Sequence, residues 1–449
     1  MGAGDDNLSS AVPADLEDEL QLICGSPGFR RSVRLQRFLR HVVERFTSAP
    51  DKPPTERQIA RAVFDRRADF DPQIDPIVRV EAGRLRLRLT EYFAGPGQND
   101  KVIIEVARGG YFPTFRRQRQ RQRDGTIDRG DAAYRLYLKG RYFWDKRSAE
   151  SIAKAADYFR QAHAVDAGFT RALTGIADCN LILATFDFAE PGPPIANARA
   201  AAESALQHDA QLAEARATVG CIQALYDRRW QDADASFQLA MELDPSYPPA
   251  WQWRGMCSCA RGRLSEGLAA LQAGAERDPV SLMVNTQLAC GLYLAKRYAE
   301  ADEACSLVLE MEPNFWPARY FRGLTYEQQG RFAQAVRDLQ AALDASGGNC
   351  LPPAALAHVH AQAGGQRDAR RILRQLEREA SRYVSPWALA LVYAGLGDAD
   401  RALGLLEDAV GLRSLQAGLF LKTDPRLEPL RSVPRFTALE DTLYASPGV

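Results

Sequence analysis

Five arginines have the side-chain type and the spacing that could bind nucleic acid. Arg79, Arg84, Arg86 and Arg88 lie within one short stretch, and Arg108 follows in a glycine-containing turn. The planar guanidinium group binds both guanine edges and phosphates through paired hydrogen bonds. If one helix and one hairpin present these side chains together, they form a surface that can enter a major groove and contact the neighbouring backbone.

The helix that would carry the first four arginines is predicted over residues 75–93, with Asp75 as its cap and Pro76 at its first position. At 100° per residue its apolar face consists of Val78, Ala82, Leu85, Leu89 and Tyr92. One flank carries Arg79 and Arg86 near Gly83 and Thr90, and the other carries Arg84 and Arg88. The residues predicted to contact DNA are Arg79, Gly83, Arg84, Arg86, Arg88, Thr90 and Arg108.

Residues 15–115 are predicted to form one domain around this helix. The expected elements are helices over residues 16–23, 32–46, 55–64 and 75–93, and strands over 101–106 and 111–115. Residues 27–123 carry 22 Lys and Arg against 11 Asp and Glu, whereas residues 124–449 carry 35 against 40. A compact basic segment joined to an acidic remainder is typical of a polyanion-binding domain on a different kind of body.

Two stretches of this domain resemble a known fold. Val80–Leu89 (VEAGRLRLRL) and Ile104–Tyr111 (IEVARGGY) resemble the recognition helix and wing of the OmpR-type response-regulator output domain, a winged helix. The whole of 15–115 is similar to an N-terminal module of bacterial tetratricopeptide proteins. The four-stranded N-terminal sheet of the OmpR type is replaced here by helices, and the wing motif is one residue shorter. The resemblance implies DNA binding by the helix and the wing.

The rest of the chain repeats itself with a period of 34 residues. Aligned positions include Trp230, Leu264, Tyr298 and Phe332, and the helix-ending Pro245, Pro279 and Pro313. Each unit is predicted to form two helices. The unit 314–346 resembles the tetratricopeptide repeat, with Gly323, Tyr326, Gly330, Phe332 and Ala335 at that family's signature positions. The chain is therefore expected to be mainly α, a winged-helix-like domain followed by an α-solenoid.

The expected organisation is a domain at 15–115, a basic linker at 116–130, about eight repeats at 131–412 and a C-terminal cap at 413–449. The arginine-rich residues 116–123 either contact phosphates beside the wing or only keep the linker soluble. The resemblance implies a concave groove that binds a peptide or another protein. Its expected lining residues are Thr218, Ile222, Gln252, Met256, Thr286, Tyr293, Tyr320, Leu324, Glu327 and His358. Alternatively, several of them pack between adjacent repeats.

The sequence favours a cytoplasmic, non-enzymatic protein. No apolar stretch approaches the roughly 20 residues of a membrane span, and the acidic N-terminus lacks a signal peptide. The eight cysteines show no CxxC pair and are expected to be small core residues. Neither these cysteines nor His358 and His360 suggest a metal site, and no catalytic or nucleotide-binding motif is found, so no cofactor is expected.

Two functional hypotheses remain open at this stage. In the first, the protein is a transcriptional regulator that binds double-stranded DNA through its N-terminal domain and a protein or peptide partner through its repeats. In the second, it is a protein-interaction scaffold whose basic domain binds an acidic partner or forms a homodimer. Val80 and Leu87, opposite the main apolar face, are the residues expected at such a dimer interface.

Overall fold

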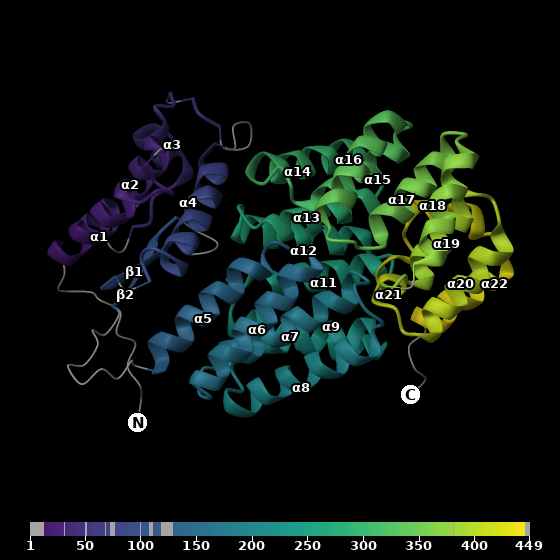
Figure 1. Cartoon of the computed structure of the whole chain (residues 1–449), viewed down its shortest axis with the longest axis horizontal. Helices are drawn as coiled ribbons and strands as arrows, with labels where there is room; N and C mark the ends of the chain where they lie inside the picture. Colours follow the sequence, from purple (N-terminus) through teal and green to yellow (C-terminus); the bar gives the residue numbers. More distant parts are fainter. Residues whose placement is uncertain are drawn as a thin grey trace.

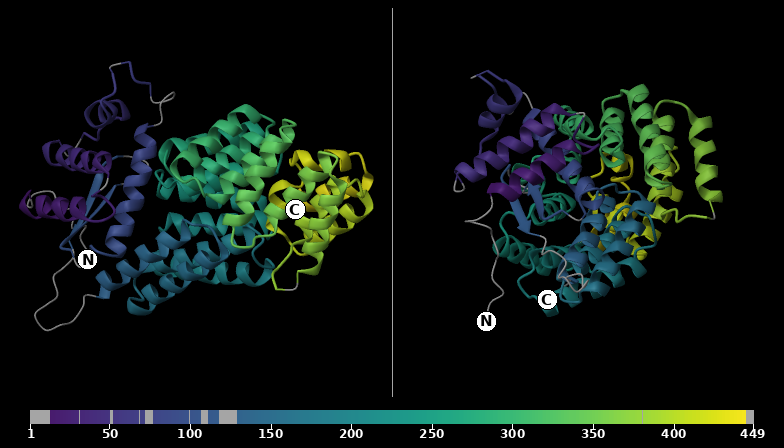
Figure 2. Two further views of the ribbon diagram at one scale, coloured as in Figure 1. Left: turned by 45° about the horizontal axis from the view of Figure 1, so that its top comes forward. Right: turned by 60° about the vertical axis from the view of Figure 1, so that its left-hand side comes forward.

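The computed structural model describes residues 13–30, 32–49, 52–67, 69–71, 77–98, 100–106, 111–117, 129–379 and 381–444. The chain is mainly α-helical (Figure 1). The N-terminal domain lies against one end of a long array of helix pairs, and the C-terminal helices lie at the other end (Figure 2). Among the described residues, no helix combines the length and the apolar composition that a membrane span requires.

The predicted helices and hairpin of the N-terminal domain are present. They are α1 (Pro13–Gly25), α2 (Val33–Ser48), α3 (Glu56–Phe64), α4 (Ile77–Ala94), β1 (Val102–Val106) and β2 (Pro113–Arg117). Ser32 caps α2, and Thr55 forms a capping box with Gln58 at the start of α3. The strands are antiparallel, with Ile104 opposite Phe115. The predicted apolar face of α4 is buried, which fixes α4 between the hairpin and the other helices.

Eight helix pairs follow, as the 34-residue period predicts. They are α5 (Arg129–Trp144) with α6 (Ala149–Val165), α7 (Thr170–Thr185) with α8 (Gly192–His208), α9 (Ala213–Leu225) with α10 (Trp230–Leu243), α11 (Pro248–Ala260) with α12 (Leu264–Arg277), α13 (Leu282–Leu294) with α14 (Tyr298–Met311), α15 (Trp316–Gln328) with α16 (Phe332–Ala345), α17 (Leu351–Gln362) with α18 (Gln366–Arg378), and α19 (Pro386–Gly395) with α20 (Ala399–Gly411). The odd-numbered helices from α9 to α17 are almost wholly buried, whereas the even-numbered ones keep an exposed face.

The period is also visible in the backbone between the two helices of each pair. The residues with positive φ at this turn are Arg228, Gly262, Lys296, Gly330, Gly364 and Gly397. A left-handed residue ends the first helix and starts the turn to the second, and glycine adopts it without a steric penalty. Four of the six positions are glycine, so the sequence and the repeated backbone geometry agree.

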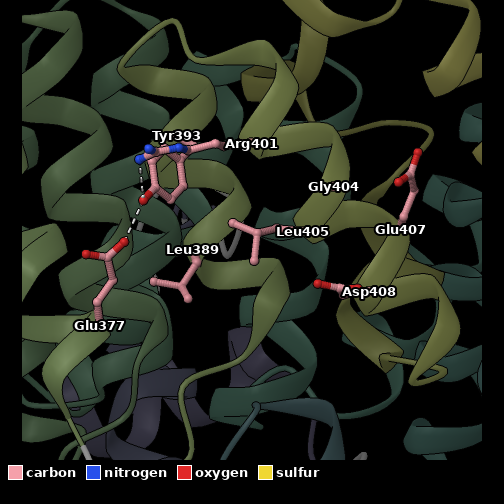
Figure 3. Close-up of a pocket in the computed structure, with 8 residues that line it drawn as sticks. All are labelled: Glu377, Leu389, Tyr393, Arg401, Gly404, Leu405, Glu407 and Asp408. Carbon is pink, nitrogen blue, oxygen red and sulfur yellow. Dashed lines mark hydrogen bonds between the residues drawn. The ribbon is translucent and has the colours of Figure 1, made fainter.

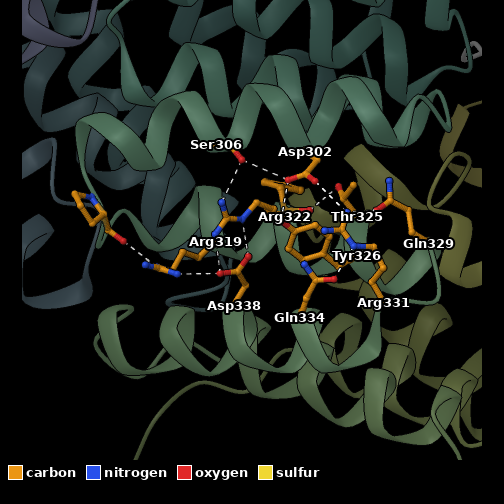
Figure 4. Close-up of polar contacts among 12 residues, drawn as sticks. Asp302, Ser306, Arg319, Arg322, Thr325, Tyr326, Gln329, Arg331, Gln334 and Asp338 are labelled. Carbon is orange, nitrogen blue, oxygen red and sulfur yellow. Dashed lines mark hydrogen bonds and ion pairs between the residues drawn. The ribbon is translucent and has the colours of Figure 1, made fainter. Parts of the chain in front are cut away.

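Small residues and polar contacts set the distance between helices. A Cβ atom at Gly255 of α11 would lie 2.7 Å from Leu271 Cγ and 2.9 Å from the Gly267 carbonyl, so these two helices approach closely. Around α15, polar contacts connect three consecutive helices (Figure 4). Arg322 Nε lies 2.6 Å from Asp338 Oδ2 of α16, and the Tyr326 hydroxyl donates to Asp302 of α14 at 2.9 Å. These contacts join α15 to its own partner helix and to the preceding unit.

The array curves until distant units touch. The Trp316 indole of α15 donates to the Arg147 carbonyl at 2.9 Å and packs edge-on against Phe186, which follows α7. Asn349 donates to the Phe186 carbonyl at 2.5 Å. Ser385, the cap of α19, donates to Asp187 Oδ2 at 2.5 Å. The loop after α7 therefore joins the early units to the late ones.

The C-terminal segment contains α21 (Leu415–Phe420), a 3-10 helix η1 (Pro425–Leu430) and α22 (Pro434–Tyr444). The last helix, α22, packs along α20 in the manner expected of an end cap. In contrast, α21 packs on α7, α9 and α11, and η1 packs on α19. The segment predicted as a cap therefore also enters the interior of the curved array.

Candidate interaction site

The arginines on the first flank of α4 are engaged within the N-terminal domain. Arg79 Nε lies 3.8 Å from Glu56 Oε1 of α3, and the Tyr111 hydroxyl donates a hydrogen bond to the same oxygen. Arg86 Nε donates to the Val106 carbonyl of β1 at 3.1 Å. Burial raises the pKa of Tyr111 above its ordinary range, so this hydroxyl remains a donor. Both arginines therefore connect α4 to neighbouring elements of its own domain.

The small residue between them faces the repeat array. A Cβ atom at Gly83 would lie 3.3 Å from Met311 Sδ at the end of α14 and 3.6 Å from Val280 Cβ. Arg84 Nη1 pairs with Glu81 at 2.9 Å, and its Nη2 donates to the Glu310 carbonyl at 3.4 Å. In this structure the Gly83 face of α4 is covered by the array, and it is not open to a DNA groove.

Two more of the predicted DNA contacts have partners within α4. Arg88 pairs with Glu91 at 2.7 Å, and Thr90 Oγ1 donates to the Arg86 carbonyl at 3.0 Å. Arg108 lies outside the described residues. Val80, expected at a dimer interface, is buried in an apolar core that also contains Val280 and Met311 of the same chain. The Leu87 side chain lies outside the part of the chain that the structure describes.

The structure draws attention to other arginines of this domain, which the sequence analysis did not select. Arg34 of α2 and Arg57 and Arg61 of α3 are exposed, and none has an ion pair among the described residues. In Figure 1, α2 and α3 lie on the side of the domain away from the array. The sequence does carry a signal for two of these arginines. Arg57 and Arg61 are four residues apart, and this spacing puts both side chains on one face of a helix.

The predicted groove residues line the inside of the array, but they do not form an open surface. All seven of the central set are buried: Gln252, Met256, Thr286, Tyr293, Tyr320, Leu324 and Glu327. Thr218, Ile222 and His358 are buried as well. The expectation of an accessible concave groove at these positions is therefore wrong, and the alternative of packing within the array is the better description.

Residues 414–430, here called the inner segment, cover a large part of this surface. The Tyr293 hydroxyl donates to Asp424 Oδ1 at 3.2 Å, and the Phe321 and Phe420 rings lie 6.4 Å apart. Gln416 Nε2 donates to the Thr185 carbonyl at 2.5 Å. The large apolar side chains of the inner segment are all buried: Leu415, Leu419, Phe420, Leu421, Leu427 and Leu430. The sequence signal that could have revealed this packing is the density of leucines in a segment predicted to be only a cap.

Buried charges are compensated where the inner segment meets the array. Arg426 and Asp424 form an ion pair at 2.6 Å, and both side chains are nearly inaccessible. Burial opposes ionisation of Asp424, but the Arg426 guanidinium outweighs it and lowers the pKa of this carboxyl. Nearby, His358 Nδ1 lies 2.6 Å from Glu327 Oε1. Burial raises the pKa of Tyr320 to about 12, so it stays neutral beside Arg426.

The cysteine thiols are not activated in the described part of the chain. All eight cysteines are buried, and burial raises the pKa of each thiol above its ordinary value. Thiols in this state are poor nucleophiles and poor metal ligands. No group of three His, Cys, Asp or Glu side chains among the described residues is placed to hold a metal ion.

Comparison with known proteins supports the repeat assignment. Residues 317–349, which cover α15, α16 and their turn, match the tetratricopeptide repeat family. Residues 317–349 therefore form a tetratricopeptide repeat. Such repeats are protein-interaction modules, and the array accordingly implies protein–protein interaction. Curated proteins yield no match.

Several solved structures are similar to this chain. Yeast Tom70 aligns over 94% of this chain and 88% of its own, with 17% identity and a TM-score of 0.41. Pseudomonas aeruginosa pilF aligns over 47% of this chain and 92% of its own, with 16% identity and a TM-score of 0.36. YrrB, described as a TPR protein with an unusual peptide-binding site, aligns over 42% and 93%, with 19% identity and a TM-score of 0.27.

Proposed function

We propose that this protein is a non-enzymatic interaction scaffold whose tetratricopeptide array binds a protein partner on its outer surface. The outer surface is formed by the exposed faces of α10, α12, α14, α16, α18 and α20. The observation that carries the proposal is the occupation of the inner surface by residues 414–430. A partner that meets the array in this state encounters the outer helices.

The energetics favour a permanently filled interior. Six large apolar side chains of the inner segment are buried, and burial of each stabilises the fold by roughly 1.5–3 kcal/mol, on the order of 10 kcal/mol in all. An external peptide would have to displace these buried side chains, and its own contacts would first have to offset the entropy lost on association. It would also compete with a segment that is covalently attached and therefore present at a high effective concentration. We therefore propose that the inner segment stays in place when a partner binds.

Photo-cross-linking in the source cells tests the proposal. A photoreactive amino acid is placed at one of the exposed outer positions Gln272, Glu303 and Arg337, or at the buried Thr286, in the full chain. Outer positions are expected to yield adducts with a discrete protein, and Thr286 is expected to yield none beyond links within the chain. Adducts from Thr286 alone, or no protein adduct from any outer position, would contradict the proposal.

DNA binding by the N-terminal domain is a second candidate function, supported by the excess of basic residues in 27–123 and by the exposed Arg34, Arg57 and Arg61. If the domain binds DNA, α2 and α3 contact the phosphates, because α4 faces the array. Anisotropy of the full chain with genomic DNA fragments tests it over a range of salt concentrations. Replacing Arg57 and Arg61 with Gln should lower the salt slope by about one per lost phosphate contact. Unchanged binding in that variant would exclude this surface.

A further inference from the structure

Helix α18 differs in charge from the other outer helices. It carries five arginines and two acidic residues, whereas α10, α12, α14, α16 and α20 each carry more acidic than basic side chains. The arginines are Arg367, Arg370, Arg371, Arg374 and Arg378. All five are exposed. Of the five, only Arg371 has an ion pair among the described residues, to Asp368 at 3.4 Å.

The spacing places these arginines on one face. At 100° per residue all five fall within an arc of about 100°, and Arg367 and Arg378 are separated by about 16 Å along the axis. We call this set the α18 stripe. It lies at the end of the array away from the N-terminal domain, as Figure 1 shows. Its charge is therefore separate from the basic surface of α2 and α3.

A shallow cavity of about 470 Å³ adjoins the stripe (Figure 3). Its wall on the α18 side is Glu377, which follows Arg374 by one turn. Leu389 of α19 and Leu405 of α20 supply apolar surface. The Tyr393 hydroxyl donates to Glu377 at 2.5 Å and accepts from Arg401 at 3.2 Å, so the polar groups between the leucines and the stripe already have partners. The cavity can therefore take an apolar side chain.

We propose that the α18 stripe and this cavity bind an acidic, amphipathic segment of a partner protein. The segment places carboxylates along the arginines and inserts one apolar side chain between Leu389 and Leu405. This inference rests on the proposed function, because it names the part of the outer surface used and the chemistry of the partner. Arginine suits the role, since its fork binds carboxylates bidentately.

The surroundings of the stripe favour an acidic peptide over a nucleic acid. Glu407 and Asp408 of α20 line the cavity on the side away from Glu377 (Figure 3), and α16, the outer helix that precedes α18, is also net acidic. A broad polyanion such as a nucleic-acid duplex would reach sideways over these carboxylates and be repelled, whereas a narrow segment can keep its own carboxylates over α18 and turn only its apolar side chain to the cavity. A short segment that matches the length of the stripe, about 12 residues, avoids this repulsion.

The test uses the full chain and a fluorescein-labelled peptide of about 12 residues, rich in glutamate and with one leucine on its opposite face. Replacing Arg370 and Arg374 with Gln should weaken binding about tenfold at low salt, through two lost ion pairs. The matched control is Arg57→Gln with Arg61→Gln, which removes the same charge from α3 and should leave peptide affinity unchanged. The Leu405→Ala variant should weaken binding equally at low and at physiological salt, because the lost contact is apolar.

The possible outcomes separate this inference from the proposed function. Equal loss in the α18 and α3 variants would show binding to net charge alone and would overturn the inference. Stronger binding of a single-stranded oligonucleotide of equal charge at α18 would overturn it in favour of nucleic acid. If the α18 variants bind the peptide normally while Gln272, Glu303 or Arg337 still cross-link to a protein, the inference fails and the proposed function stands.

Discussion

Asp187 takes part in the contact between the loop after α7 and the start of α19, which closes the curved array. Its side chain is buried, its φ is +52°, and Ser385 donates to it at 2.5 Å. Burial raises the pKa of Asp187 to about 7. In the unfolded chain this group titrates near its ordinary value of about 4. Between about pH 4 and pH 7 the folded state therefore holds a proton that the unfolded state has lost, so this group makes stability fall as pH rises through that window.

The variant Asp187→Asn should remove that fall. Asparagine adopts the left-handed conformation readily and keeps an oxygen for the Ser385 hydroxyl. We expect it to be more stable than the natural protein by about 2–4 kcal/mol at pH 8 and nearly equal at pH 4. Thermal unfolding at both pH values measures the difference. Neighbouring Cys350 and Tyr383 do not interfere, because burial raises the pKa of both groups beyond this window. Parallel pH profiles of the two proteins would show that Asp187 is ionised when folded.

A second residue-scale prediction concerns the ion pair inside the array. Replacing Arg426 with Met leaves Asp424 buried without its partner, and loss of one member of a buried pair costs about 3–5 kcal/mol. The lowered pKa of Asp424 means that its contribution is complete at neutral pH and is lost as pH falls below about 4. The deficit of the variant in urea unfolding should accordingly shrink on acidification. A deficit that is the same at pH 7 and pH 3 would contradict the pairing.

Among individual residues, the sequence predicted burial better than function. The apolar face of α4 and the capping roles of Ser32 and Thr55 follow from local spacing, and the structure confirms them. The partners of Arg79 and Gly83 could not be predicted, because Glu56 and Met311 are brought there by tertiary packing. A helical wheel shows which face is apolar, but it does not show whether a distant repeat covers another face.

At the scale of elements, one glycine in a turn and one in a helix test the backbone geometry of the array. Gly330 has a φ of +71° and no atom within 4 Å of a built Cβ, so Gly330→Ala should destabilise the protein by about 1–2 kcal/mol through backbone conformation alone. Gly404 lies inside α20, also with open space around it. There, alanine should stabilise by roughly 0.5–1 kcal/mol, because it is the better helix former. Thermal midpoints that shift in the same direction for both variants would contradict the assigned backbone geometry.

The arrangement of the elements also explains why the sequence predicted the helix pairs but did not predict that the inner segment packs inside the array. A 34-residue period specifies helix pairs and their turns through contacts that are local or between adjacent units. The inner segment instead meets α7, α9, α11 and α19 across large separations in sequence. Its residues carry no period, so a pattern search places them outside the repeats and gives no signal of where they pack.

For the whole molecule, the packing of α4 on α14, which holds the N-terminal domain to the array together with its contact to α5, can be tested at one residue. Gly83→Trp introduces a side chain where Met311 and Val280 leave no room, and the domain should separate from the array without unfolding. Small-angle X-ray scattering should then show a larger radius of gyration. Gly25→Trp is the matched control, since nothing lies within 4 Å of a Cβ at Gly25. An unchanged radius in Gly83→Trp would show that the domain is not held through this face of α4.

The most direct measurement on the whole molecule is amide hydrogen exchange of the unmodified full chain, read over the inner segment. If residues 414–430 permanently fill the interior, α21 and η1 should exchange as slowly as the buried helices α13 and α15. A partner would then be left with the outer helices, as we propose. Exchange in α21 and η1 that is as fast as in the exposed ends of the array would show that the segment leaves the interior. The concave surface would then be open to a partner, contrary to the proposal.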